Sequence, residues 1–452
     1  MIAGAHSGAG KTSVTAGLIG ALVSRGLRVQ PFKVGPDYID PTYLTCAAGR
    51  PCRNLDSWMV PGAALRELYG RASADADIAV VEGVMGLFDG HPRFAGAGSS
   101  AEIAKTLGLP VVLVVDVSHM AQSAAAVAHG YASLDADLRV VGMIANNVGS
   151  PGHARLVVDA VEHLAGLPVL GSLARREDLV LPERHLGLIP TDEGRVVDGF
   201  FARLTEHVGA GVDLAAVLRL AESAQPMAVE PSGLWPGERQ PPRVNVAVAR
   251  DEVFCFYYQD NLDLLAAHGA RLLPFSPLHD RAVPEEADGL YLGGGFPELF
   301  AEQLAANRSM IESIRRVDAQ GLPIYAECGG LMYLCQSLAD PEGRRHELVG
   351  LLPARAVLRG KRVVVAYAEV RACRQNPLLA AGDAARGHEF HWSSLEEHFP
   401  AEQSAYEMED GRAEGYQRDN LLASYVHLHF ASNPRLAPNF VAACAGRGAA
   451  RC

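Results

Sequence analysis

Residues 4–12 read Gly4-Ala-His-Ser-Gly8-Ala-Gly10-Lys11-Thr12, and apolar residues at helical spacing follow them. A strand, a glycine-rich loop and a helix start in this order are typical of a P-loop, whose backbone N–H groups hold phosphate oxygens. Lys11 is expected to reach the β- and γ-phosphates of ATP, and the Thr12 hydroxyl to bind Mg²⁺. The loop therefore predicts a nucleotide site that includes Gly8, Gly10, Lys11 and Thr12.

The spacing of this loop differs from the usual G-x-x-x-x-G-K-[ST], because Ala5 stands where glycine is usual and Gly4 comes one position earlier. Dethiobiotin synthetase and its relatives have the longer spacing, which this loop resembles. The alternative is a glycine-rich turn that only opens a helix. Gly-Lys-Thr between a strand and a helix favours the phosphate site.

Short apolar runs alternate with helical patterns outward from this loop to about residue 195, and again from residue 244. Such alternation predicts parallel sheets with helices on both faces. Between the two series, residues 223–242 carry five prolines and no clear periodicity, as expected for a linker. The expected strands are 78–81, 110–115, 140–145 and 169–173, then 244–249, 271–275, 289–292, 323–326, 363–370 and 422–430.

The fold class predicted from these patterns is α/β, with two tandem three-layer domains. Residues 1–222 form a P-loop NTPase-like domain with a parallel sheet, and residues 223–242 form the linker. Residues 243–438 form a second α/β domain, and residues 439–452 are left as a tail.

Composition excludes several classes of protein. The formal net charge of -12 argues against a nucleic-acid binder, which needs clustered Lys and Arg. No apolar stretch of about 18 residues exists, so no membrane span is expected. The eight cysteines include no CxxC pair, so we expect free thiols and a cytoplasmic protein.

Charged residues gather at the expected strand ends of the first domain: Lys33, Asp37, Asp40 and Glu82. In open parallel sheets, ligands bind beyond the carboxyl ends of strands. Mg²⁺ takes one or two carboxylates together with phosphate oxygens. We therefore expect Lys33 at the ATP, and Asp37 and Glu82 with Thr12 at the metal.

Structural explanations also exist for some of these residues. Asp40 before Pro41 could be a helix N-cap, and Asp37 could hold a turn. Asp116 ends another apolar run and is either a carboxylate on the metal side or a loop cap. Asn146 ends a further strand; its amide is assigned to ATP as a reader of adenine, although Asn is also a common turn residue.

A second constellation lies in the C-terminal half. Residues 323–334 read as a strand, a sharp turn and a helix, with Cys328 at the turn before two glycines. Small neighbours allow a nucleophile elbow, and a helix N-terminus favours the thiolate. The thiol needs a base partner, and two histidines, His427 and His429, occur in a later segment. The alternative for Cys328 is a buried small residue, which the flanking glycines disfavour.

A glycine run after an upstream strand, residues 292–296, offers backbone N–H groups to a developing oxyanion. The predicted oxyanion-hole residues are Gly294, Gly295 and Gly329. Cys335, one or two helical turns after Cys328, is expected in the core.

These motifs together resemble the cobyrinate a,c-diamide synthase family, and the resemblance runs along nearly the whole chain. It implies a dethiobiotin-synthetase-like ATP domain joined to a class I glutamine-amidotransferase-like domain. The expected activity is stepwise amidation of the a and c carboxylates of a corrin ring through a phosphorylated carboxylate. The stretches that carry the resemblance are 5–12, 32–41, 81–90, 325–334 and 423–430, with 387–393 in support.

By its motifs, the resemblance makes Cys328 the glutaminase nucleophile and His427 its base. It assigns Asp40 to the acid substrate. Expected partners are cobyrinic acid or a related tetrapyrrole carboxylate, ATP and glutamine, with Mg²⁺ as cofactor and a homodimer as a possible assembly. Class I amidotransferases place Glu two residues after the catalytic histidine, where this chain has His429.

Other functions remain open at this stage. The same chemistry could act on hydrogenobyrinate or nickel-sirohydrochlorin, and cobyric acid synthase is a more distant reading. A P-loop switch ATPase with a degenerate amidotransferase domain would carry an extra lysine early in the loop, and residues 4–9 have none. A non-catalytic binding protein would not require Cys328 and His427.

Overall fold

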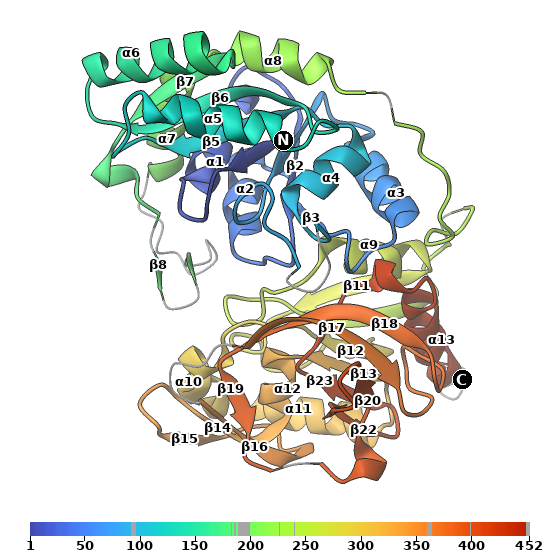
Figure 1. Ribbon diagram of the computed structural model, residues 1–452. Coiled ribbons are helices and arrows are strands. Elements are labelled where there is room, and N and C mark those ends of the chain that lie inside the picture. The colour runs from blue at the N-terminus through green and yellow to red at the C-terminus, as the bar shows by residue number, and fades with distance from the viewer. Residues whose placement is uncertain are drawn as a thin grey trace. The chain divides into compact units, whose positions relative to one another are not determined.

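The computed structural model describes residues 1–91, 96–181, 183–184, 187–188, 199–225, 227–238, 240–358, 364–397 and 399–448 (Figure 1). The chain divides into two compact units, Met1–Glu230 and Pro231–Cys452. The division falls inside residues 223–242, the predicted linker. Each unit is α/β, as the sequence predicts.

The N-terminal unit is built on one parallel sheet of seven strands in the order β3-β2-β4-β1-β5-β6-β7. β1 lies between β4 and β5, so the loop that follows β1 opens at the middle of the sheet edge. The four strands expected between residues 78 and 173 are confirmed, with ends that differ by up to three residues. The strands are β1 (Ile2–Gly4), β2 (Val29–Val34), β3 (Arg53–Leu55), β4 (Ile78–Glu82), β5 (Val111–Asp116), β6 (Val140–Val148) and β7 (Val169–Ala174).

Helix α1 (Lys11–Val23) is mostly buried and packs closely against α7 (Phe200–Gly211). Glycines make this approach possible: a Cβ on Gly17 would lie 2.4 Å from Val208 Cγ2, and one on Gly20 2.1 Å from Thr205 Oγ1. This packing fixes the helix whose first turn carries the P-loop lysine. The other helices are α2 (Asp40–Ala48), α3 (Gly62–Ser73), α4 (Ser100–Leu107), α5 (Ser123–Ser133), α6 (Pro151–Ala160) and α8 (Leu214–Glu222).

The C-terminal unit has a central sheet of six strands in the order β11-β10-β12-β13-β23-β22, parallel except for β22. β12, β13 and β23 are neighbours, so their carboxyl ends bring three distant segments together. The strands are β10 (Val244–Ala249), β11 (Ala270–Phe275), β12 (Gly289–Leu292), β13 (Ile324–Glu327), β22 (Tyr416–Arg418) and β23 (Leu421–Ser424).

Two smaller sheets, β15-β14-β16-β19 and β21-β20-β17-β18-β24, complete this unit. The single strand expected at 422–430 is instead two strands in different sheets, because β23 pairs with β13 and β24 pairs with β18. The strands are β14 (Cys335–Ala339), β15 (Arg345–Glu347), β16 (Leu352–Leu358), β17 (Val364–Ala372), β18 (Ala384–His391), β19 (Ser393–Leu395), β20 (Tyr406–Met408), β21 (Ala413–Glu414) and β24 (His427–Leu428).

The helices of the C-terminal unit include one that the sequence did not predict. α13 runs through the first part of residues 439–452, the segment expected as a tail, and buries Phe440, Val441 and Cys444. Among the described residues, no helix has the length and apolarity that a membrane crossing needs. The helices are α9 (Gln259–Ala267), α10 (Ala301–Ala306), α11 (Arg308–Ala319), α12 (Gly329–Leu334) and α13 (Leu436–Gly448).

Candidate functional site

The phosphate-loop residues follow β1 and lead directly into α1. Gly8 and Gly10 have φ of 81° and 88°, a left-handed conformation that glycine adopts at no steric cost. A Cβ on Gly10 would lie 2.2 Å from the Asn146 side-chain nitrogen. Gly10 therefore serves both the backbone turn and the close approach of a neighbouring strand.

Lys11 explains the unusual spacing of the loop. Its side chain folds back over Gly4, where a Cβ would lie 2.8 Å from Lys11 Cδ. Its Nζ donates to the His6 carbonyl at 3.3 Å, and the side chain is buried. Burial, and next the nearby Lys33 ammonium, lower the pKa of Lys11. Because Gly4 has no side chain, the Lys11 side chain has room to lie across the loop.

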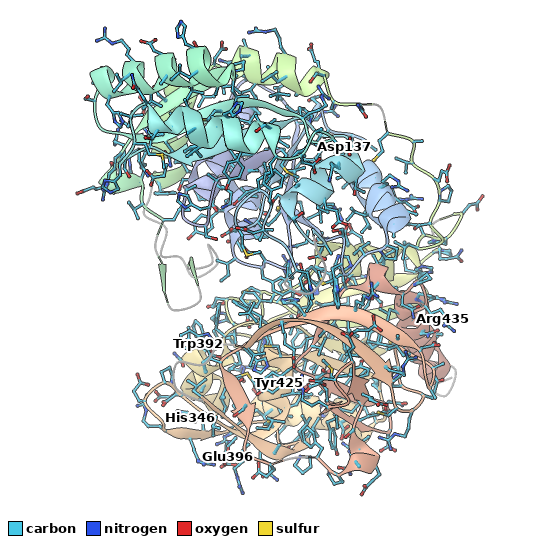
Figure 2. The ribbon with its side chains drawn as sticks, in the orientation of Figure 1. Asp137, His346, Trp392, Glu396, Tyr425 and Arg435 are labelled. Carbon is cyan, nitrogen blue, oxygen red and sulfur yellow. The ribbon has the colours of Figure 1, made fainter. Side chains whose placement is uncertain are left out.

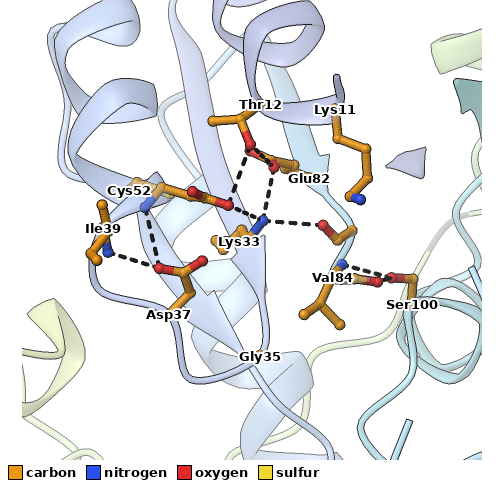
Figure 3. Close-up of polar contacts among 12 residues, drawn as sticks. Lys11, Thr12, Lys33, Gly35, Asp37, Ile39, Cys52, Glu82, Val84 and Ser100 are labelled. Carbon is orange, nitrogen blue, oxygen red and sulfur yellow. Dashed lines mark hydrogen bonds and ion pairs between the residues drawn. The ribbon is translucent and has the colours of Figure 1, made fainter. Parts of the chain in front are cut away.

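A compact cluster of charged and polar side chains lies next to the loop (Figure 3). Lys33 Nζ is 2.6 Å from Asp40 Oδ2 and 2.8 Å from Glu82 Oε1. The Thr12 hydroxyl donates to Glu82 Oε1 at 2.7 Å and lies 3.3 Å from Asp40 Oδ2. The structure thus brings together three of the residues that the strand-end argument selected and the P-loop residue Thr12.

Strand pairing produces this cluster. Lys33 and Glu82 are opposite each other in the parallel pair β2 and β4, so their side chains start as neighbours. Burial raises the pKa of Glu82, while the Lys33 ammonium lowers it. The pKa of Lys33 is raised, because the Asp40 and Glu82 carboxylates outweigh its desolvation. Within the described residues, Glu82 Oε2 is buried and has no hydrogen-bond partner.

Asp37 and Asp40 differ in their tasks. Asp37 Oδ1 accepts from the Ile39 N–H at 2.8 Å and the Asp40 N–H at 3.2 Å, so it holds the turn before α2. Burial, and next the neighbouring Asp40, raise the pKa of Asp37 to about 7. Asp40 is the first residue of α2 but makes no side-chain cap; it pairs with Lys33 instead. The cap-like interaction expected of Asp40 is therefore made by Asp37.

Two further strand-end residues support loops in this structure. Asn146 Nδ2 donates to the Ala9 carbonyl at 3.0 Å, so its amide braces the phosphate loop. Asp116 accepts from the Ser118 N–H at 2.8 Å and from the Asn147 side chain at 2.9 Å, as a loop cap does. The reading of adenine by Asn146 remains a prediction.

Cys328 occupies the turn between β13 and α12. Its φ of 45° is in the left-handed region, where residues other than glycine are strained, as expected for a nucleophile elbow. Its N–H donates to the Ser424 carbonyl at 2.8 Å, which ties the turn to the neighbouring strand β23. Burial, and next the Glu298 carboxylate, raise the pKa of the thiol, whereas the Gly329 amide lowers it.

His427 is fully buried at the start of β24, close to the glycine loop that follows β12. A Cβ on Gly294 would lie 2.3 Å from His427 Cε1, so only glycine leaves room for the imidazole. The His427 ring stacks on His388 with centroids 5.0 Å apart. Asn261 of α9 holds the ends of this segment, donating to the Leu428 carbonyl at 2.8 Å and accepting from the Phe430 N–H at 2.7 Å.

The oxyanion-hole expectation changes at one position. The Gly294 N–H donates to the Phe256 carbonyl at 3.3 Å, in an isolated bridge, so it does not face a ligand. Gly295 and Gly329 remain adjacent, since a Cβ on Gly329 would lie 2.9 Å from Gly295 N. The amides of Gly295 and Gly329 therefore remain the predicted donors.

Glu327 was not selected from the sequence, although it directly precedes Cys328. Its carboxylate is 3.8 Å from His427 Nδ1. Tyr291 donates to it at 3.0 Å, the Leu428 N–H at 3.1 Å, and the Tyr325 hydroxyl also donates to it. The signal that selected Glu82, a carboxylate that ends an apolar strand, is present at Glu327 as well.

His429 lies two residues after His427 and contacts other groups. Its Nδ1 accepts from the Ala431 N–H at 3.2 Å, and its ring packs against Tyr258 with centroids 4.6 Å apart. Burial lowers the pKa of His429 to about 3, so the ring is neutral. His429 therefore shapes the backbone after β24.

Tyr425, labelled in Figure 2, packs against the end of β18, the strand that also approaches Cys328. Its ring stacks on His391 at a centroid distance of 4.0 Å, and its hydroxyl accepts from Ser393 at 3.0 Å. The Cys328 sulfur approaches the Phe390 carbonyl of the same strand, β18, at 3.7 Å. β18 thus covers the nucleophile, which accounts for the burial of the thiol.

Comparisons with known proteins match both units. Residues 1–189 match the CobQ/CobB/MinD/ParA nucleotide binding domain, and residues 245–435 match the CobB/CobQ-like glutamine amidotransferase domain. The chain is 46% identical to the cobyrinate a,c-diamide synthase of Syntrophotalea carbinolica over 99% of this chain and 98% of that protein. It is 44% identical to that of Dehalococcoides mccartyi strain CBDB1 (98% and 97%) and 42% identical to that of Salmonella typhimurium (98% and 97%).

Proposed function

Because the chain belongs to the cobyrinate a,c-diamide synthase family, we propose that it amidates the a and c carboxylates of cobyrinic acid, with ATP and with ammonia from glutamine. The observation that carries this proposal is identity of 42–46% to synthases of that name over nearly the whole length of both chains. The enzyme is a glutamine-hydrolysing, ATP-dependent amidating ligase. Both constellations that such an enzyme needs are present, one in each unit.

ATP is needed because phosphorylation turns an oxygen of the substrate carboxylate into a good leaving group. A carboxylate is a poor electrophile because attack by ammonia would have to expel oxide. The substrate carboxylate attacks the γ-phosphorus of ATP, ADP leaves, and ammonia then displaces phosphate from the acyl phosphate. Lys11 and Lys33 stabilise the negative charge on the transferred phosphoryl group, and the amides at Gly8 and Gly10 hold phosphate oxygens.

The described residues contain no ready-made group of three acidic, histidine or cysteine side chains for a metal, so a magnesium ion beside the loop would share its ligands between the protein and phosphate oxygens. Thr12 and Glu82 offer a hydroxyl and a carboxylate, and the buried Glu82 Oε2 lacks a hydrogen-bond partner among the described residues. Hard oxygen donors of this kind suit Mg²⁺. We assign Thr12, Glu82 and Asp37 to the metal and Asp40 to the substrate side. The ion would neutralise phosphate charge during transfer.

Glutamine hydrolysis uses the second constellation. The Cys328 thiolate attacks the side-chain amide of glutamine, and the Gly295 and Gly329 amides receive the oxyanion. His427 takes the thiol proton and gives it to the departing ammonia. Water then cleaves the thioester to glutamate and restores Cys328.

Two broader assignments accompany this function. The cysteines within the described residues are free thiols, which suits a reducing compartment and supports placing the enzyme in the cytoplasm. A homodimer is a possible assembly, and light scattering of the purified protein would decide it.

The test is mass spectrometry of cobyrinic acid incubated with the purified full chain, Mg-ATP and glutamine. Two successive conversions of acid to amide are expected. Cys328→Ser should abolish them with glutamine and leave them intact with free ammonia. If the enzyme amidates hydrogenobyrinate or nickel-sirohydrochlorin instead of cobyrinate, the assigned substrate changes and the proposed reaction stands. Glutamine-driven amidation by Cys328→Ser would overturn the glutaminase assignment.

A further inference from the structure

Glu327 is a buried carboxylate that the proposed mechanism has not yet used. It is 1% exposed and is the last residue of β13, immediately before Cys328. Its Oε2 is 3.8 Å from His427 Nδ1, an ion-pair distance. A carboxylate is costly to bury, so its surroundings indicate what it is kept for.

Neutral donors hold this carboxylate in place. Tyr291 donates to Oε2, and the Tyr325 hydroxyl and the Leu428 N–H donate to Oε1. These bonds fix both oxygens and offset part of the desolvation, but none of them brings a positive charge. The negative charge of Glu327 therefore stays available to a neighbour that becomes positive.

His427 is the neighbour that can become positive. Gly294 confines one edge of its ring, and His388 stacks on its face. His388 is itself held by a 2.8 Å hydrogen bond between its Nδ1 and the Tyr258 hydroxyl. Burial, and next the other two histidines, lower the pKa of His388, so it offers no charge to His427.

Two of the groups beside His427 therefore differ in charge. His388, which stacks on the ring, is neutral, whereas the Glu327 carboxylate lies 3.8 Å from Nδ1 of the same ring. In Cys–His and Ser–His sites, a carboxylate behind the imidazole fixes its tautomer and stabilises the imidazolium. That carboxylate commonly comes from another segment than the histidine, because only the geometry is required.

We propose that Glu327 is the positioning residue for His427, taking the part of the carboxylate that position 429 does not supply. It keeps the Nδ1 proton on the side of the carboxylate and leaves Nε2 to accept the Cys328 proton. When that proton moves, the thiolate and the imidazolium form together, and Glu327 stabilises the imidazolium. The inference rests on the proposed glutaminase role of Cys328 and His427.

Glu327→Gln in the full chain tests it, since the amide keeps the size and removes the charge. We expect kcat for glutamine hydrolysis to fall about 100- to 10,000-fold, as carboxylate-to-amide changes behind a catalytic imidazole do. The KM for glutamine should stay within about threefold, because Glu327 touches His427 and not the substrate. The acidic limb of the kcat profile should move to lower pH, because the imidazolium loses its counter-charge.

Controls separate this inference from other causes. Glu414→Gln removes another buried carboxylate of the same unit, one that accepts from the Tyr425 N–H at 2.9 Å, and should leave the acidic limb in place. Ammonia-driven amidation by Glu327→Gln should match the wild type, which shows that the chain is folded. If that activity is lost too, Tyr291→Phe decides, because it loosens the same carboxylate; its kcat should fall with no change in KM.

The outcomes are distinct. Full kcat with glutamine in Glu327→Gln, or an unmoved acidic limb, would overturn the positioning role. If Cys328→Ser, measured in parallel, kept glutamine-driven activity, the glutaminase assignment itself would fail. Equal losses of kcat in Glu327→Gln and Glu414→Gln would show that any buried carboxylate here serves structure alone.

Discussion

Glu82 and Glu327 are two buried carboxylates that end central strands of the two units, β4 and β13. Both precede a loop that carries chemistry, yet their partners differ. Glu82 contacts the Lys33 ammonium and the Thr12 hydroxyl. Glu327 contacts tyrosine hydroxyls, a backbone amide and the imidazole of His427.

This difference separates two kinds of chemistry. A carboxylate paired with a permanent cation suits a site that handles phosphate and metal charge, because the local charge does not change with proton transfer. A carboxylate held by neutral donors beside an imidazole suits a site where a proton moves. The kind of group that compensates a buried carboxylate therefore indicates the chemistry of the site better than the position of that carboxylate in its strand does.

The largest expected effect comes from removing the permanent cation. Lys33→Met leaves the carboxylates of Asp40 and Glu82 buried without their counter-charge, which costs about 3–5 kcal/mol of unfolding free energy. Urea unfolding of the N-terminal unit, followed by the fluorescence of Trp58 in a chain with Trp235 and Trp392 replaced by Phe, measures it.

The control for that experiment is Lys105→Met. Lys105 pairs with Asp135, and its side chain is 40% exposed, so water compensates the loss and the change should stay below about 1 kcal/mol. If both substitutions lowered the unfolding free energy equally, the cluster around Lys33 would be no different from an ordinary surface ion pair.

The next effect tests the geometry around the imidazole. Gly294→Ala would place a Cβ 2.3 Å from His427 Cε1, so the ring must move. A displacement of about 1 Å at a catalytic group can cost ~100-fold in rate. We expect that loss in glutamine hydrolysis, measured as glutamate release, with ammonia-driven amidation retained. A variant with wild-type glutaminase activity would contradict the placement of His427 against Gly294.

The sequence predicted the phosphate loop, most strand ends and the Cys328 elbow, because each is a local pattern of glycines at a strand–helix junction. It missed Glu327, although the same reasoning selected Glu82. In the sequence, Glu327 looks like the last residue of the strand before the nucleophile. Its partners Tyr291 and Leu428 come from distant segments, so the sequence gives no sign that they contact it. Gly294 was assigned to the oxyanion, because sequence alone cannot separate an amide that faces a ligand from a glycine that makes room for a ring.

A smaller effect tests how Glu327 is held. Tyr325→Phe removes one donor to the carboxylate, and a hydrogen bond to a charged group is worth about 1.5–3 kcal/mol. The unfolding free energy of the C-terminal unit should fall by that amount. Tyr333→Phe is the matched control, since the Tyr333 hydroxyl is buried without a hydrogen-bond partner in the described part of the chain. Urea unfolding followed by Trp235 and Trp392 fluorescence, with Trp58 replaced, compares the two.

A further effect, spread over about three pH units, concerns the pH dependence of the phosphate site. Burial raises the pKa of Asp37 from 3.8 to about 7, so the folded state binds a proton that the unfolded state releases. The contribution is therefore fully present below pH 3.8 and is lost as pH rises toward 7, with a slope of at most about 1.4 kcal/mol per pH unit. Asp37→Asn removes this titration, while its side-chain oxygen can still accept from Ile39 and Asp40.

The unfolding free energy of Asp37→Asn should therefore rise relative to the wild type between pH 4 and pH 7 and stay level above pH 7. Asp116→Asn should differ from the wild type in the opposite sense and at lower pH, below 3.8. Although burial raises the pKa of Asp116, its hydrogen bonds with Ser118 and Asn147 lower it overall, so its contribution is lost as pH falls. Parallel pH profiles for Asp37→Asn and the wild type would show that Asp37 is ionised throughout. The N-terminal cluster would then hold the carboxylates of Asp37, Asp40 and Glu82 against the single ammonium of Lys33, two more negative charges than Lys33 balances.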